Sequence, residues 1–315
     1  TSRLESIATY AMICSSPHHL RLFTEEESWM LMKEKVFGED DDCPEELEEI
    51  GKQIAGKCGG LPLAVVLVAG LLVKRDNDVV YWKEVGESLK SNIKSCSDIV
   101  ESSYQYLTIE LQKCFLYFAS FAEDQIIRVS KLIRLWIAEG FVKTSTSKSL
   151  EMLGMEYLME LISSNLVTIR KRSSLGEPKT VHIHDLIHEF CSVKAKEKNF
   201  VGRINGIPYL DGHGAYCKRV SISAPSQIIH LHNSSFGRDI RSISFRYSNR
   251  GPVVDFDSDV SWERLRVLDL SYVTLSRTTL YSLPMMRNLS YLELYMYFLK
   301  IPDGIIESLT NLETF

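Results

Sequence analysis

Apolar residues recur at the spacing of amphipathic helices over residues 20–97. Thr24 and Glu27 have the spacing of a capping box, which predicts the start of a first helix. The Gly59-Gly60 pair ends a second helix, and Pro62 fits the first turn of a third. The apolar stripes of the first two helices are Trp29, Met32 and Val36, and Leu47, Ile50, Ile54 and Cys58. This pattern predicts a compact helical bundle.

Further along the chain, the pattern changes to three helices followed by two short strands. Ser130 is predicted to cap the second of these helices. The strands are predicted at Leu166–Arg170 and Thr180–Ile183, joined by a turn with Ser, Gly and Pro. Three helices and such a hairpin are typical of a winged-helix domain, which we place at residues 98–200. Residues 201–216 are polar and contain glycines, which indicates a linker.

The last third of the chain repeats the pattern LxxLxL. Copies start at Cys217, Ile240, Leu265, Leu289 and Leu312. Successive starts are 23 to 25 residues apart, which is the spacing of leucine-rich repeats. Because one strand cannot bury its own leucines, the units are expected to stack into a solenoid over residues 217–315. The sequence thus predicts a multidomain fold, mainly α at first and then α/β.

Composition excludes several classes of protein. The 315 residues are 45% hydrophobic and carry a net charge of −5, which argues against a general nucleic-acid binder. The seven cysteines form no CxxC pair and indicate reduced, mostly buried thiols. The apolar run over residues 61–73 is too short to span a bilayer and predicts a buried helix. The chain starts at Thr1-Ser2-Arg3 without a signal peptide pattern, and we expect a piece of a longer protein.

One candidate ligand site lies where a strand is predicted to turn into a helix. His182 and His184 alternate with apolar residues, and Asp185 is a natural N-cap for the apolar run that follows. A helix N-terminus favours anions, and a nearby histidine can complete a phosphate site. The alternative for His184 is a polar residue on the open face of the strand.

Two other kinds of site are not expected. The nearby potential metal ligands lack the spacing of a zinc finger: His182, His184, His188 and Cys191. A winged helix also suggests DNA binding, and it carries cations: Lys131, Arg134, Arg170, Lys171 and Arg172. The helix around Trp136 is strongly apolar, however, and is expected to pack against a neighbouring domain. No catalytic constellation is present, and no direct DNA binding is expected.

The order of these domains and several motifs resemble plant nucleotide-binding leucine-rich-repeat (NB-LRR) disease resistance proteins of the coiled-coil class, in particular those of the late blight resistance type. Gly59–Ala64 is similar to the GGLPLA motif of that family. Cys114–Asp124 resembles its CFLYCxLFPED motif, with Ala122 where proline is usual. Leu132–Phe141 is similar to its winged-helix motif, and Ile183-His184-Asp185 stands at its Met-His-Asp position.

The resemblance implies a role for each candidate site residue. His184 would contact the β-phosphate of ADP, with Asp185 as its structural support. Leu61 and Pro62 would border the adenine, and Arg3 would meet the triphosphate of ATP. In the family, the phosphate-binding loop and the acids that hold Mg²⁺ precede this segment. Neither ADP nor ATP is therefore expected to bind tightly to this chain alone.

The resemblance also implies a function. Residues 1–19 would end the nucleotide-binding α/β domain, followed by the ARC1 bundle with its GLPL motif and the ARC2 winged helix. The whole protein would be a cytoplasmic ADP/ATP-regulated switch in plant defense that triggers the hypersensitive response. It would attach peripherally to membranes and oligomerise on activation. Any ATPase activity would be slow and regulatory in the whole protein and absent from this piece.

The implied partner of the repeats is a pathogen effector or a guarded host protein. Side chains between the leucines project from the strand face: Arg266, Asp269, Tyr291, Glu293 and Tyr295. They suit protein recognition, and they are equally expected as solvated residues or as contacts that hold the nucleotide-binding module closed. The alternative function is a nucleotide-independent scaffold, or a truncated relative, that binds proteins through its repeats.

Overall fold

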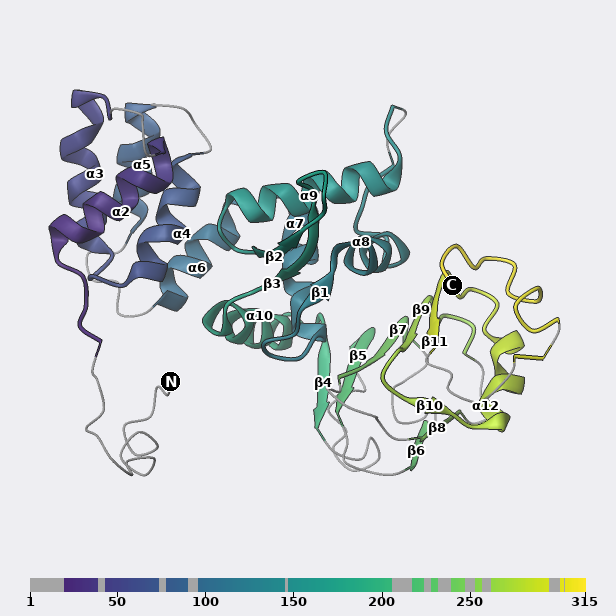
Figure 1. Ribbon diagram of the computed structural model, residues 1–315. Coiled ribbons are helices and arrows are strands. Elements are labelled where there is room, and N and C mark those ends of the chain that lie inside the picture. The colour runs from purple at the N-terminus through teal and green to yellow at the C-terminus, as the bar shows by residue number, and fades with distance from the viewer. Residues whose placement is uncertain are drawn as a thin grey trace. The chain divides into compact units, whose positions relative to one another are not determined.

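The computed structural model of the chain describes residues 20–38, 43–73, 78–89, 96–144, 147–205, 217–223, 228–231, 239–246, 253–256, 262–294, 301–302 and 304–315. Contacts divide the chain into two units, Thr1–Cys96 and Ser97–Phe315 (Figure 1). Within the described ranges, no helix combines the length and the apolar character that crossing a bilayer requires.

Helices make up the described part of the first unit, which confirms the predicted helical bundle. They are α2 (Glu25–Phe37), α3 (Glu45–Lys57), α4 (Pro62–Leu72) and α5 (Val79–Ser88). The capping box is present: Thr24 Oγ1 accepts from the Glu27 N–H at 3.1 Å, and Glu27 Oε2 accepts from the Thr24 N–H at 2.8 Å. Helix α4 is buried along most of its length and packs against α2 and α5. The apolar run over residues 61–73 therefore forms a core helix.

A winged helix opens the second unit. Its elements are α6 (Cys96–Gln105), α7 (Ile109–Leu116), the 3-10 helix η1 (Tyr117–Ser120), β1 (Ile127–Arg128), α8 (Val129–Ala138), α9 (Leu150–Ser163), β2 (Thr168–Arg172), β3 (Pro178–His182) and α10 (Asp185–Glu197). Strand β3 lies between β1 and β2, and both pairings are antiparallel. Phe115, Phe118 and Trp136 are buried in its core.

Three local predictions for the winged helix are wrong by one or two residues. The second strand, β3, runs over Pro178–His182 and not over Thr180–Ile183. Strand β2 starts at Thr168 because the N–H groups of Leu166 and Val167 instead bond to the Leu161 carbonyl and close the end of α9. Helix α8 starts at Val129, so Ser130 is not its cap. The two-residue strand β1 leads directly into this helix and leaves no room for a separate capping turn.

Parallel strands follow at the predicted repeat spacing. They are β5 (Arg219–Ser223), β7 (Ser242–Phe245), β9 (Val267–Leu270) and β11 (Tyr291–Leu294). The bridge between Tyr291 and Thr314 continues the same register into the next copy. A second parallel sheet contains β6 (Ile228–Leu231), β8 (Val253–Phe256) and β10 (Thr274–Leu275), and α12 (Arg277–Ser282) and η2 (Leu283–Met285) follow it. The repeated leucines are buried, as expected at the start of a leucine-rich-repeat array: Leu265, Leu268, Leu270, Leu289 and Leu292.

The predicted linker is wrong at its beginning. Strand β4 (Gly202–Asn205) pairs parallel with β5 and completes a five-stranded sheet of order β11-β9-β7-β5-β4. Ile204 is buried in the core of the repeats, which gives this segment an apolar anchor that its polar composition obscures. The repeat sheet therefore begins soon after α10, while residues 206–216 lie outside the described residues.

Candidate functional site

His184 lies at the turn between β3 and α10 and is exposed. Its backbone is extended, and its Nδ1 atom accepts a hydrogen bond from the Leu186 N–H at 3.2 Å, so His184 is the N-cap of α10. The prediction that Asp185 caps this helix is therefore wrong by one residue. Because Nδ1 is the acceptor, the neutral imidazole carries its proton on Nε2, where it can donate to an oxygen.

Asp185 is the first residue of α10, and its carboxyl group interacts with that of Asp124. Sharing a proton with Asp185, followed by the negative charge of Asp185, raises the pKa of Asp124. Asp124 also has a positive φ of 60°, a conformation uncommon for a residue with a side chain. The structure thus joins the ends of two motifs that are far apart in sequence, and sequence reasoning missed this pairing.

A buried histidine holds the same helix in place. His188 Nε2 lies 3.0 Å from the Phe121 carbonyl oxygen and donates to it. Burial is the main cause that lowers the pKa of His188, so the neutral form is favoured. His184 and His188 therefore have different roles on one helix: His184 is exposed at its first turn, and His188 fixes it to the residue after η1.

The remaining predicted site residues belong to the first unit or lie outside the described residues. Pro62 is the first residue of α4, as predicted, and Leu61 is the N-cap of this helix. The preceding Gly60 has a φ of +72°, and its carbonyl accepts from the Phe23 N–H at 2.9 Å, which pins this turn to the segment before α2. Arg3 is among the residues that the structure does not describe.

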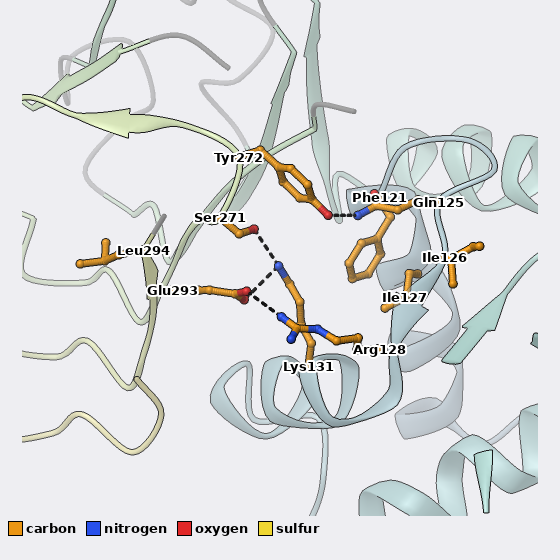
Figure 2. A pocket seen from close by; sticks show the side chains of 10 residues that line it. All are labelled: Phe121, Gln125, Ile126, Ile127, Arg128, Lys131, Ser271, Tyr272, Glu293 and Leu294. Carbon is orange, nitrogen blue, oxygen red and sulfur yellow. Dashed lines mark hydrogen bonds and ion pairs between the residues drawn. The ribbon is translucent and has the colours of Figure 1, made fainter. Parts of the chain in front are cut away.

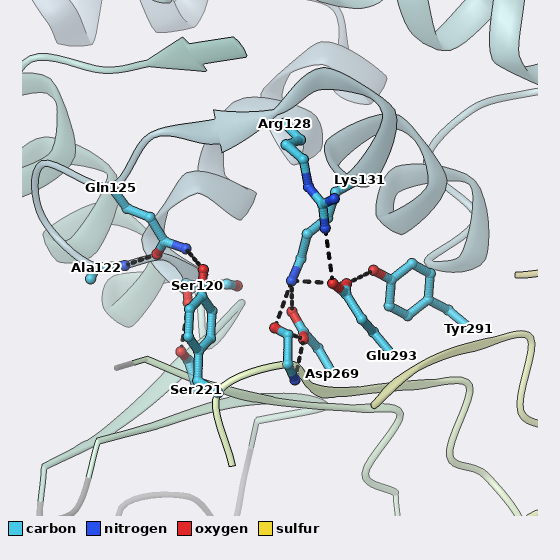
Figure 3. Close-up of polar contacts among 11 residues, drawn as sticks. Ser120, Ala122, Gln125, Arg128, Lys131, Ser221, Asp269, Tyr291 and Glu293 are labelled. Carbon is cyan, nitrogen blue, oxygen red and sulfur yellow. Dashed lines mark hydrogen bonds and ion pairs between the residues drawn. The ribbon is translucent and has the colours of Figure 1, made fainter. Parts of the chain in front are cut away.

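The winged helix and the repeats meet through a buried cation, Lys131 of α8. Lys131 Nζ lies 2.7 Å from Asp269 Oδ2 and 3.0 Å from Glu293 Oε2 (Figure 3), and it donates to Ser271 Oγ at 2.9 Å (Figure 2). Burial opposes the charged form, but attraction by the two carboxylates outweighs it and raises the pKa of Lys131. Arg128 adds a second cation to Glu293 at 3.3 Å. We call these five residues the Lys131 network.

A cavity of about 360 Å³ lies beside the Lys131 network. Figure 2 shows Gln125 reaching across it from the winged helix to Tyr272 of the repeats, and their hydrogen bond measures 2.9 Å. Phe121 and Ile127 line the apolar side of the cavity. The network and the cavity therefore share one junction.

A second contact joins the same two parts near β5. Arg219 Nε lies 2.6 Å from Glu139 Oε2, and both side chains are mostly buried. The Arg219 guanidinium also lies 4.8 Å from the ring centre of Phe141 and 4.5 Å from that of Phe200. Next to it, Ser221 Oγ donates to the Ser120 carbonyl at 2.6 Å (Figure 3).

These contacts decide between alternatives that the sequence leaves open. Asp269 and Glu293 face the winged helix, and Tyr291 OH donates to Glu293, so these three are intramolecular contacts. Arg266 is exposed, and Tyr295 lies outside the described residues. The helix around Trp136 was expected to pack against a neighbouring domain. Lys131 of this helix pairs with acids of the repeats. In the described ranges, no three His, Cys, Asp or Glu side chains are grouped to hold a metal ion.

Comparison with known proteins identifies the family of the chain. Residues 121–191 match the family described as the disease resistance protein winged helix domain. The chain belongs to the plant disease resistance proteins.

Among its relatives, two putative late blight resistance protein homologs of Solanum demissum are 43% and 44% identical over 235 and 234 residues. A late blight resistance protein of the same species is 42% identical over 234 residues. Each alignment covers 74% of this chain and 17% of the relative, so the chain corresponds to a small part of these proteins.

Proposed function

We propose that this chain is part of an immune receptor that switches between ADP-bound and ATP-bound states in plant defense. Its winged helix is the ARC2 element of an NB-LRR protein, and its repeats begin the leucine-rich-repeat solenoid. The relatives named above are late blight resistance proteins and homologs. Support also comes from the order of the motifs and from the contacts between the winged helix and the repeats.

The geometry of His184 carries this proposal. Its Nδ1 is engaged with the Leu186 N–H, so the exposed ring presents an Nε2–H donor beside the start of α10. A donor at a helix N-terminus fits a phosphate oxygen. Asp185 interacts with Asp124, which fits a structural role for Asp185. ADP would supply the phosphate for His184, while Leu61 and Pro62 would border its base and Arg3 would meet ATP.

The contacts within the second unit supply the link from nucleotide to repeats. Lys131 and Arg219 tie the winged helix to the repeat sheet through ion pairs that are mostly buried. A conformational change in the winged helix would therefore be transmitted to the repeats. In the whole protein we propose that an effector or guarded host protein acts on the repeats, that Mg²⁺ and ATP complete the active state, that activation leads to oligomers, and that hydrolysis is slow.

The test separates ligand binding by His184 from helix capping. In the complete receptor, His184→Ala removes both functions, whereas His184→Asn keeps a capping oxygen. Lys196→Gln, an exposed change on the same helix, is the control. Bound nucleotide is quantified after denaturing the purified protein, and cell death is scored in leaves.

We expect both His184 variants to hold about tenfold less ADP, as for a lost hydrogen bond to a charged group. We also expect them to signal without an effector. If His184→Asn retains ADP like the control while His184→Ala loses it, the histidine is only a cap. A complete receptor that copurifies with no nucleotide would support the nucleotide-independent scaffold.

A further inference from the structure

The hairpin formed by β2 and β3, which we call the wing (Thr168–His182), is strongly basic. Its exposed cations are Arg170, Lys171, Arg172 and Lys179. In the described part of the chain, no carboxylate lies within ion-pair distance of any of them. Glu177 is the one acid of the wing. This local excess of positive charge contrasts with the net charge of −5 of the whole chain.

This cluster of charge coincides with a register irregularity. Side chains on a regular strand alternate between the two faces, so three consecutive residues cannot all face solvent on a sheet with one buried face. The pairing of β2 with β3 shifts between Ile169 and Lys171 and again between Lys171 and Arg172. A bulge bends the strand and re-aims its side chains. Arg170, Lys171 and Arg172 lie at these irregularities, and all three are exposed.

An apolar side chain stands at the tip of the same hairpin. Leu175 is 86% exposed. The turn that carries it is well formed: the Ser173 N–H donates to the Glu177 carbonyl at 2.7 Å, and Arg172 Nη1 donates to the Gly176 carbonyl at 2.7 Å. Gly176 has a φ of +83°, which suits the turn. The fold therefore keeps Leu175 exposed to solvent between flanking cations.

We propose that the wing docks on an anionic membrane surface, with its cations at the lipid phosphates and Leu175 in the headgroup region. Basic residues near a bilayer are attracted by anionic lipids, and an exposed apolar side chain gains by entering the interface. This proposal does not depend on nucleotide binding.

Helix α9 argues against duplex DNA as the ligand. In winged-helix DNA readers, a recognition helix enters the major groove beside the wing. Helix α9, which precedes the wing, carries Glu151, Glu156 and Glu160 and contains no Lys or Arg. These three acids are exposed and would be repelled by the phosphates. DNA would also leave Leu175 without an apolar environment.

The test measures partition of the 315-residue chain onto vesicles. Neutral phosphatidylcholine vesicles are compared with vesicles in which about a third of the lipid is phosphatidylserine. Three variants are compared with the parent chain: the triple variant Arg170→Gln/Lys171→Gln/Arg172→Gln, Leu175→Ser, and a control triple variant. The control, Lys83→Gln/Lys113→Gln/Lys196→Gln, removes the same charge from scattered exposed sites.

We expect the wing triple variant to lower partition onto anionic vesicles about a hundredfold, and Leu175→Ser to lower it about tenfold. The control triple variant should stay within about threefold of the parent chain, because its charges are scattered over three helices and leave the cluster of cations on the wing intact. Circular dichroism checks that all variants remain folded.

Three outcomes would overturn the proposal. They are equal partition onto neutral and anionic vesicles, equal losses in the two triple variants, and wing-dependent binding to duplex DNA without binding to vesicles. An independent readout uses Leu175→Trp in the parent chain. Its fluorescence should shift to shorter wavelength with anionic vesicles if the tip enters the interface, and an unshifted spectrum contradicts insertion.

Discussion

Lys131 and Asp269 form an ion pair with 2.7 Å between Nζ and Oδ2, and their side chains are only 9% and 5% exposed. The lysine comes from the winged helix and the aspartate from the repeat sheet. Ser271 donates to Asp269 through both its N–H and its hydroxyl, so the carboxylate is held in one orientation. Burying two charges is costly unless such bonds satisfy them. The ion pair therefore favours one specific position of the repeats against the winged helix.

Removing one partner of this pair should destabilise the second unit. Lys131→Met leaves Asp269 buried without its cation, and we expect the free energy of unfolding to fall by about 3–5 kcal/mol. Urea unfolding followed by circular dichroism measures the change. Lys148→Met, which removes an exposed pair with Glu156, should cost less than about 1 kcal/mol. A double variant with Asp269→Asn should recover part of the loss, and strictly additive losses would show that the two residues are not coupled.

Arg219 should not tolerate replacement by lysine. Its planar guanidinium pairs with Glu139 and lies against the rings of Phe141 and Phe200. An ammonium group cannot stack in this way, so Arg219→Lys should lower the free energy of unfolding by about 1–3 kcal/mol. The matched control is Arg264→Lys, because Arg264 forms an exposed pair with Asp239. Equal stability of the two variants would mean that stacking contributes nothing.

Two glycines of α3 should respond oppositely to alanine. A Cβ at Gly51 would lie 2.1 Å from Trp29 Cζ3, so Gly51→Ala must displace a buried ring and should cost about 1–3 kcal/mol. A Cβ at Gly56 would have no neighbour closer than 3.9 Å. Gly56→Ala should therefore stabilise the helix by up to about 1 kcal/mol. Thermal unfolding compares them, and a destabilising Gly56→Ala together with a neutral Gly51→Ala would contradict this packing.

Stability should fall as the pH drops below about 6.5, the ordinary pKa of histidine. The pKa of His188 is lowered in the folded chain, chiefly by burial, so the unfolded chain binds a proton more readily. The stability gained from neutral His188 is therefore present above a pH of about 6.5 and is lost as the pH falls toward the folded value. In His188→Gln, the unfolding free energy measured between about pH 7.5 and 5.5 should be flatter by up to about 1.4 kcal/mol per pH unit. Identical pH profiles would exclude His188 as the cause.

Features that depend on near neighbours in sequence were predicted well. The Thr24–Glu27 capping box and the start of α4 at Pro62 involve residues within one turn of each other. The strands of the repeats follow the period of the leucines, because each copy must present the same apolar face. Strand β4 was missed because its partner β5 lies beyond a polar segment that carries no such period.

In the candidate site, too, the local features were predicted and the contacts between distant residues were not. The sequence placed a histidine and an aspartate at the junction of a strand and a helix, but not which of them caps the helix. That choice depends on the extended backbone of His184 and on the hydrogen bond that its Nδ1 accepts from the Leu186 N–H. By itself, the sequence determined the order of elements, the repeat period and the resemblance to a family, because these depend on the spacing of residues that are close together in the sequence. Only the tertiary structure decided that Lys131 meets Asp269 and Glu293, because burial and charge pairing act between segments that folding alone brings together.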